Sequence, residues 1–196
     1  MHSKRLVVLA SGSGTNLQAL LDAPDLGGAV VGVLSDRPAV LALERAAARG
    51  VHTAAVPLDG DRIAWEETLT DRVASLQPDL VVLAGFMRVL SGAFVHRWPV
   101  VNIHPSLLPA FPGAHAVQDA LAWGVKVTGV TVHFVDEMVD HGPIIAQEAV
   151  PVHAGDTPET LHARLQKVEH QLLPDVVRDW CAGRLIRDGR HVRTQP

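Results

Sequence analysis

The sequence predicts an α/β fold built on a single-domain, doubly wound and mostly parallel sheet. Short β-branched runs alternate with longer segments whose apolar residues recur at helical period, as in successive β-α units. The strand-like runs are apolar with little alternation, as expected where helices cover both faces of a sheet. In the first half, the expected strands are Arg5–Ala10, Val30–Leu34, His52–Val56, Leu80–Gly85 and Val100–Ile103. The expected helices are Leu17–Ala23, Val40–Arg49, Ile63–Leu76 and Gly92–His96.

The pattern changes in the second half of the chain. Two longer strands, Lys126–Val135 and Gly142–Val152, are joined by a short turn-like segment. A helix is expected from Pro158 to about Arg178, because Thr157 is a favourable N-cap and proline suits the first helical position. The tail predicts a hairpin around Asp188-Gly189. No linker, repeat or composition break divides the chain, so we expect one domain over residues 1–196.

Composition excludes several classes of protein. The 196 residues carry a formal net charge of −4 and no basic block, which argues against binding to nucleic acid. The single cysteine, Cys181, excludes an intramolecular disulfide framework and a cysteine-based zinc site. The longest apolar stretch, Leu80–Met87, is far shorter than a bilayer span, and Leu6–Ala10 is too short for a signal peptide. We therefore expect a cytoplasmic protein with no membrane partner.

A glycine-rich turn, Ser11–Asn16, follows the first expected strand. In open α/β sheets, ligands bind beyond the carboxyl ends of the strands, and a glycine turn before a helix can offer backbone N–H groups to an anion. The turn lacks the lysine of a Walker loop and the third glycine of the dinucleotide fingerprint. The alternative is a tight turn in which Thr15 or Asn16 merely caps the helix.

Asn102 and His104 lie at the end of the fifth expected strand, where alternation places both side chains on one face. A carboxamide donor beside an imidazole suits the stabilisation of an oxyanion and the transfer of a proton near neutral pH. The alternative is a histidine whose hydrogen bonds are satisfied inside the protein.

Asp140 lies in the turn between the two long strands. An aspartate at such a place commonly hydrogen-bonds its own backbone. The functional interpretation is a carboxylate that orients His104 and favours its charged form, or that relays a proton through water. The 11 histidines show none of the spacings of a metal site, so no metal is expected.

Five segments, in their order along the chain, closely resemble the folate-dependent phosphoribosylglycinamide formyltransferases. The resemblance covers roughly residues 5–180. The segments that contain N-I-H-P-S-L-L-P and D-H-G-P-I mark the wider formyltransferase superfamily. The glycine turn narrows the resemblance to the glycinamide enzymes, because in those enzymes this turn holds the substrate phosphate. The segments are S-G-S-G-T-N-L-Q-A-L, L-A-G-F-M-R-V-L, N-I-H-P-S-L-L-P-A-F-P-G-A-H, T-V-H-F-V and D-H-G-P-I-I-A-Q.

The resemblance implies an enzyme of purine biosynthesis. It would transfer the formyl group of 10-formyltetrahydrofolate, as co-substrate, to the glycyl amine of 5-phosphoribosylglycinamide, without a metal. Asn102 and His104 would stabilise the tetrahedral intermediate, and Asp140 would relay the proton. The protein would act on these small molecules as a monomer or a homodimer.

The resemblance also implies a division of the chain and further site residues. Residues 1–100 would form a Rossmann-like phosphate-binding half, and residues 101–196 the folate-binding and catalytic half. The implied residues are Gly14, Thr15 and Asn16 for the substrate phosphate, Glu169 for the substrate, Arg62, Met87, Arg88, Val89, Leu90 and Asn102 for the folate, and Thr131 and His133 in support.

Two departures from the family and three alternative functions remain open. Val117-Gln118 stands where many members are expected to have a basic residue or a histidine, and His141 adds positive charge beside Asp140. A formyltetrahydrofolate deformylase would use water as acceptor, but normally carries an additional N-terminal domain. A methionyl-tRNA formyltransferase normally carries a C-terminal RNA-binding domain. A catalytically silent folate- or nucleotide-binding module is disfavoured by the intact Asn102, His104 and Asp140.

Overall fold

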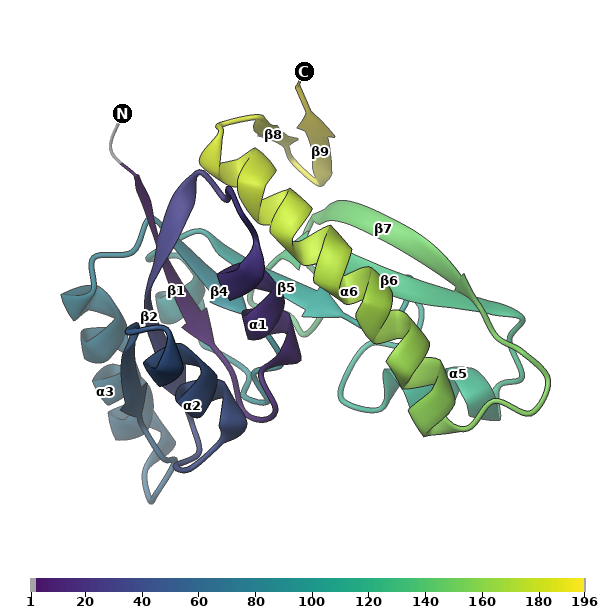
Figure 1. Ribbon diagram of the computed structural model, residues 1–196, viewed down its shortest axis with the longest axis horizontal. Helices are drawn as coiled ribbons and strands as arrows, with labels where there is room; N and C mark the ends of the chain where they lie inside the picture. Colours follow the sequence, from purple (N-terminus) through teal and green to yellow (C-terminus); the bar gives the residue numbers. More distant parts are fainter. Residues whose placement is uncertain (1–2, 196) are drawn as a thin grey trace.

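The computed structural model describes residues 3–195, in which seven strands form one sheet and two more form a separate hairpin (Figure 1). The order in the sheet is β3-β2-β1-β4-β5-β6-β7. The first five strands pair in parallel, and β6 and β7 are antiparallel to their neighbours. The strands are β1 (Lys4–Leu9), β2 (Gly28–Ser35), β3 (His52–Ala55), β4 (Leu80–Leu83), β5 (Val100–His104), β6 (Val127–Phe134), β7 (Ile144–Pro151), β8 (Leu185–Asp188) and β9 (His191–Thr194).

Helices cover both faces of the sheet, and each face has its own apolar core. Along β1, Leu6 and Val8 belong to the core under α1, α2, α5 and α6, whereas Val7 and Leu9 belong to the core under α3 and α4. Both faces of β1 are therefore buried, which explains its continuous apolar run. The helices are α1 (Thr15–Asp22), α2 (Leu41–Ala48), α3 (Arg62–Ser75), α4 (Gly92–Val95), α5 (Ala116–Ala122) and α6 (Pro158–Cys181).

The strand order reverses between β1 and β4. The chain passes from β1 outward through β2 and β3, and returns to the other side of β1 as β4. In doubly wound sheets, the crevice at such a reversal is the usual ligand site. The carboxyl ends of β1, β4 and β5 all open toward this crevice, because these strands are parallel. Figure 1 shows α6 running along the front of the sheet, from α5 at one end to the β8–β9 hairpin at the other.

The predicted fold class is confirmed, and the expected strands and helices follow one another along the chain as predicted, with ends that differ by at most three residues. One helix was not predicted: α5 has seven residues, too few to show a clear helical period, and it is stabilised by burying Ala116, Val117 and Ala120. The last helix runs to Cys181, beyond the expected end near Arg178. The hairpin around Asp188-Gly189 is confirmed.

The glycine turn does not use a side chain to cap α1. Gly14 is the N-cap residue, with a φ of 69°, and no side-chain hydrogen bond caps the helix. The alternative that Thr15 or Asn16 serves as the cap is therefore wrong. A β-carbon at position 14 would lie 2.7 Å from Cα of Ala42, so both the backbone conformation and the close approach of α2 require glycine there.

Candidate functional site

A cavity of about 870 Å³ opens at the carboxyl ends of β1, β4 and β5. Its size lies within the usual range for small-molecule sites. The turn after β1, the segment after β4, the end of β5 and the first half of α6 all contribute to its wall. The wall includes Gly14, Thr15, Asn16, Met87, Arg88, Val89, Leu90, Asn102, His104, His133, Asp140 and Glu169.

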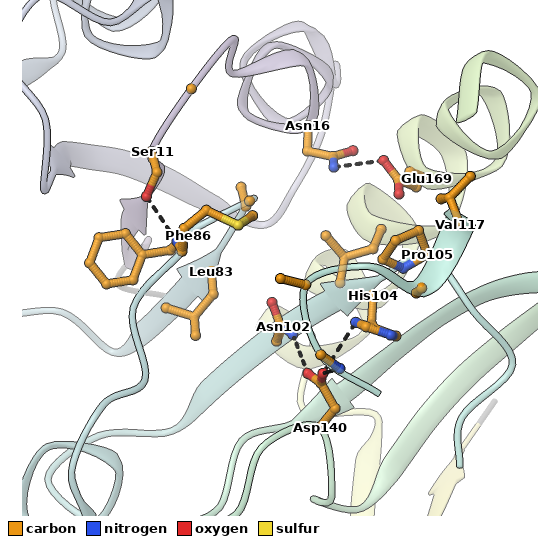
Figure 2. A pocket seen from close by; sticks show the side chains of 18 of the residues that line it. Ser11, Asn16, Leu83, Phe86, Asn102, His104, Pro105, Val117, Asp140 and Glu169 are labelled. Carbon is orange, nitrogen blue, oxygen red and sulfur yellow. Dashed lines mark hydrogen bonds and ion pairs between the residues drawn. The ribbon is translucent and has the colours of Figure 1, made fainter. Parts of the chain in front are cut away.

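The cavity brings Asn102, His104 and Asp140 into contact (Figure 2). Nδ2 of Asn102 donates to Oδ1 of Asp140 over 3.4 Å, and Nδ1 of His104 lies 3.4 Å from Oδ2. Asn102 and His104 share a face of β5, as alternation predicts. The Asp140 carboxylate therefore faces β5, a distant segment of the chain, which excludes the alternative of a carboxylate bonded only within its own turn.

Asp140 is held in an unusual environment. Its φ is 51°, a left-handed conformation that aspartate tolerates better than most residues. Burial acts to raise its pKa, whereas contact with His133 and with the N–H group of Gly113, 2.7 Å from Oδ2, acts to lower it. The charges of His104 and His133 act in the same direction, so the pKa of Asp140 lies below its ordinary value. The carboxylate is therefore ionised at neutral pH.

His104 is almost fully buried, and both of its ring nitrogens face oxygen atoms. Nε2 donates to the carbonyl oxygen of Phe111 over 2.8 Å, because a carbonyl can only accept. Nδ1 faces the carboxylate of Asp140. This arrangement suits a doubly protonated ring, since each nitrogen then has a hydrogen to donate. It also means that the Nε2 hydrogen is bound by the loop that follows β5.

His133 lies closer to the cluster than the sequence suggested. Its Nε2 is 3.2 Å from Nδ2 of Asn102 and 3.7 Å from Oδ1 of Asp140, while Nδ1 donates to the carbonyl of Phe134. The signal that could have found it is strand pairing, because Asn102 and His133 are direct partners in the β5–β6 ladder. That register cannot be read from either segment alone.

Thr131 does not line the cavity. Its hydroxyl donates to the carbonyl of Ser106 over 2.7 Å and accepts from the N–H group of Leu108 over 3.1 Å. The side chain thus anchors the loop that follows His104.

The glycine turn and α6 meet at the other end of the cavity. Asn16 donates from Nδ2 to Oε2 of Glu169 over 2.9 Å, and Figure 2 shows the two side chains pointing toward each other. Glu169 is buried. Oδ1 of Asn16 is buried and has no hydrogen-bond partner within residues 3–195. The first turn of α1 also offers backbone N–H groups without helical acceptors, which suits an anion.

The segment after β4 forms an apolar part of the cavity wall. Met87 and Val89 are more than half exposed, as are Met138 and Val139, which line the same cavity. Arg62 donates to the carbonyl of Val89 but does not itself line the cavity. Arg62 thus contacts the segment after β4 without lining the cavity, unlike the other residues expected to contact a folate.

The two departures from the family lie at different places. Gln118 lines the cavity beside the buried Val117. His141 is exposed and does not line it; its Nδ1 lies 3.0 Å from Oδ2 of Asp136. Asp36, a buried carboxylate just after β2, was not among the residues predicted from the sequence. The rule that ligand sites follow parallel strands could have pointed to it.

Residues 3–195 contain neither a metal-binding cluster nor a membrane-spanning helix. No group of three histidine, cysteine, aspartate or glutamate side chains there could hold a metal ion. None of the helices in that range is both long enough and apolar enough to cross a membrane. The expectation that the reaction needs no metal stays a prediction.

Comparison with known proteins gives consistent matches. A family model described as formyl transferase matches residues 4–177. The phosphoribosylglycinamide formyltransferase of Mycobacterium tuberculosis (strain ATCC 25618 / H37Rv) is 52% identical over 175 residues, covering 86% of this chain and 81% of that protein. The trifunctional purine biosynthetic protein adenosine-3 of Bos taurus is 45% identical over 195 residues, 95% of this chain, and the chain spans 19% of that longer protein.

A solved structure agrees with these matches. Glycinamide ribonucleotide transformylase 1 from Symbiobacterium toebii has a TM-score of 0.95 and 47% sequence identity, covering 100% of this chain and 95% of that one. The family model spans most of the chain, and the similarity extends through the whole sheet and α6. The chain therefore belongs to the formyl transferase family, among the phosphoribosylglycinamide formyltransferases.

Proposed function

We propose that the protein transfers the formyl group of 10-formyltetrahydrofolate to the glycyl amine of 5-phosphoribosylglycinamide, a step of purine biosynthesis. The observation that carries this proposal is the contact of Asn102 and His104 with Asp140 in the cavity that the glycine turn and the segment after β4 also line. The names of the similar proteins support the same reaction.

The two substrates would enter from opposite ends of the cavity. The phosphate of the ribonucleotide would bind at Gly14, Thr15 and Asn16, with Glu169 facing the rest of that substrate. Formylfolate would lie along Met87–Leu90, which Arg62 supports through Val89. In this arrangement, residues 1–100 supply the phosphate site and part of the folate site, and residues 101–196 supply the catalytic groups.

The chemistry follows from the groups that meet between these ends. The amine, as free base, attacks the formyl carbon, so a carbon–nitrogen bond forms and the carbonyl oxygen becomes an oxyanion. Asn102 and protonated His104 would donate hydrogen bonds to that oxygen, and one such donor is typically worth about 10²- to 10³-fold in turnover. The proton lost by the amine would pass by way of Asp140 and water to the folate nitrogen, whose bond to the formyl carbon breaks.

In this mechanism, Nε2 of His104 must exchange one hydrogen-bond acceptor for another. The hydrogen bond that Nε2 now donates to the carbonyl of Phe111 would be redirected to the oxyanion as charge develops there. The ionised carboxylate of Asp140 would face Nδ1 throughout the exchange and hold the ring in place. Holding both substrates in line would supply much of the remaining acceleration.

The experiment follows the absorbance of 10-formyltetrahydrofolate with and without the ribonucleotide. Turnover that requires the ribonucleotide supports the transferase. Turnover without it supports a deformylase, and binding without turnover supports a silent module. In the transferase case, His104→Ala and Asp140→Ala should each reduce turnover by about 10²-fold or more while the fold survives. His153→Ala, at an exposed histidine outside the cavity wall, is the control and should leave turnover unchanged.

A further inference from the structure

Three residues from three strand ends form a buried polar network beside the cavity. Ser11 follows β1, Asp36 follows β2 and Arg88 lies after β4. Oγ of Ser11 donates to Oδ1 of Asp36 over 2.5 Å, and Nε of Arg88 donates to Oδ2 over 2.6 Å. Each carboxylate oxygen of Asp36 therefore takes one partner from a different strand end.

The network joins the glycine turn to the segment after β4. Ser11 uses its one hydroxyl hydrogen for Asp36, and its oxygen accepts from the N–H group of Met87 over 2.8 Å. Figure 2 shows the Ser11 hydroxyl directed at this backbone. The N–H group of Ser11 in turn donates to the carbonyl of Gly85 over 3.0 Å. A displacement of Asp36 would thus disturb contacts of both the glycine turn and the segment after β4.

Arg88 and Ser11 line the cavity, and Arg88 is the charged partner of Asp36 there. The side chain of Asp36 is 0% exposed and that of Arg88 is 33% exposed, and Arg88 lines the cavity whereas Asp36 does not. The hydrogen bond found for Arg88 within residues 3–195 uses Nε, which leaves the terminal nitrogens of the guanidinium to face other groups. A buried carboxylate is retained in a protein when it is paired, and here its cationic partner is a residue of the proposed folate site.

We propose that Asp36 is a positioning residue for formylfolate: through Nε, it fixes the Arg88 side chain against the cavity wall in the orientation that receives the folate. The inference rests on the proposed function, because that function places formylfolate along Met87–Leu90. Asp36 does not line the cavity and acts on formylfolate through Arg88. The bond to Ser11 fixes the carboxylate itself, so that the orientation of Arg88 is set by the ends of β1 and β2.

The test is Asp36→Asn, which preserves shape and an oxygen for Ser11 but cannot balance the charge of Arg88. The KM for formylfolate should rise about ten-fold, the effect of losing one hydrogen bond to a charged group. The KM for the ribonucleotide and kcat should stay within about two-fold of the unsubstituted protein. An unchanged KM with a lower melting temperature would show a structural role only and overturn the proposal. An equal rise in both KM values would also overturn it.

The matched control is Asp156→Asn. Asp156 and Arg164 form another ion pair with a buried carboxylate, with side-chain exposures of 6% and 28%, and neither lines the cavity. Loss of that pair should lower the melting temperature without changing either KM. If this variant also raises the KM for formylfolate, the effect of Asp36→Asn reflects general loss of stability and the proposal fails.

A double-mutant cycle tests the route through Arg88. In an Arg88→Ala background, Asp36→Asn should add no further rise in the KM for formylfolate, because the side chain that Asp36 positions is gone. The same substitution should raise the melting temperature of Arg88→Ala, since it removes a buried carboxylate that has lost its cation. A further rise in KM in that background would overturn the proposal.

Failure of the proposed function can be told apart from failure of this inference. The unsubstituted protein is assayed first, and absence of ribonucleotide-dependent turnover would count against the function alone. Titration calorimetry with 5-formyltetrahydrofolate would then decide on Asp36. Weaker binding by Asp36→Asn than by the unsubstituted protein supports the positioning role. Equal binding, or no binding by the unsubstituted protein, overturns it.

Discussion

Asn16 and Glu169 are 153 positions apart in the sequence, yet the amide of Asn16 donates to Oε2 of Glu169 over 2.9 Å. This bond ties the first turn of α1 to the middle of α6, and both side chains line the cavity. The bond therefore sets the separation between the glycine turn and the wall that faces it. If the phosphate of the ribonucleotide binds at the glycine turn, as proposed, the Glu169 carboxylate faces the rest of that substrate.

Glu169→Gln should raise the KM for the ribonucleotide about ten-fold and leave the KM for formylfolate unchanged, because the amide replaces a charged acceptor without changing shape. Steady-state kinetics with each substrate varied in turn measures the two values. Glu159→Gln is the control, since Glu159 also lines the cavity but is exposed on the first turn of α6. A rise in KM for both substrates alike would contradict the separate placement of the two ligands.

Gly142 controls the path of the chain just after Asp140. A β-carbon at position 142 would lie 1.8 Å from the carbonyl oxygen of Phe134, so alanine there forces the backbone to shift. Displacing a catalytic group by about 1 Å can cost about 10²-fold in rate. Gly142→Ala should therefore reduce kcat by about 10²-fold through Asp140, while most of the fold survives.

The matched control is Gly129→Ala. Its β-carbon would lie 2.2 Å from the carbonyl oxygen of Glu148, a similar collision within the β6–β7 pair. This variant should lower the melting temperature but reduce the kcat of the folded protein less than Gly142→Ala does. Equal losses of kcat would show that damage to the strand pair, rather than movement of Asp140, explains both results.

Local sequence patterns predicted the features that depend on neighbouring residues along the chain. The apolar runs gave the five parallel strands, and alternation placed Asn102 and His104 on one face of β5. Their position at the carboxyl end of a parallel strand then pointed to the cavity. The resemblance to formyltransferases singled out Asp140, and its contact with Asn102 and His104 emerged only in the folded chain.

The features that sequence patterns did not place depend on contacts between distant segments. His133 joins the cluster through the antiparallel register of β5 and β6, which neither strand encodes alone. Asp36 forms its network with residues 25 positions before it and 52 after it. Helix α5 is too short to be stable without the packing of its buried alanines and Val117. In each case, tertiary context decides the outcome.

Asp140 should not titrate in the range where the enzyme works. Its folded pKa is lowered, so the carboxylate stays ionised from neutral pH down to below the ordinary value of about 4. Asp140→Asn should reduce kcat by about 10²-fold at every pH above this value, and the deficit should persist toward acid pH. Rates measured from pH 5.5 to 9 test this. A variant whose deficit disappears toward pH 5.5 would show that Asp140 is already protonated there.

Asp156 should make folding stability depend on acid pH. Arg164 and the N–H group of His153 hold the pKa of Asp156 well below its usual range; burial opposes this, and Thr160 contributes further. Because the folded pKa is depressed, the stabilisation is fully present above the unfolded pKa of about 4 and is lost as pH falls toward the folded pKa. Asp156→Asn should therefore lower the melting temperature at pH 7, and the difference from the unsubstituted protein should narrow below about pH 4.

The control for Asp156 is the pair of Asp175 and Arg178, which are exposed to 65% and 35% and lie one turn apart on α6. Exposed ion pairs of this kind contribute little, because both charges are well solvated and the side chains lose freedom. Asp175→Asn should leave the melting temperature nearly unchanged at every pH. Equal effects of the two substitutions would contradict this prediction. They would mean that the loss of any carboxylate at or near α6 lowers the melting temperature, and that the contacts of Asp156 have no special role.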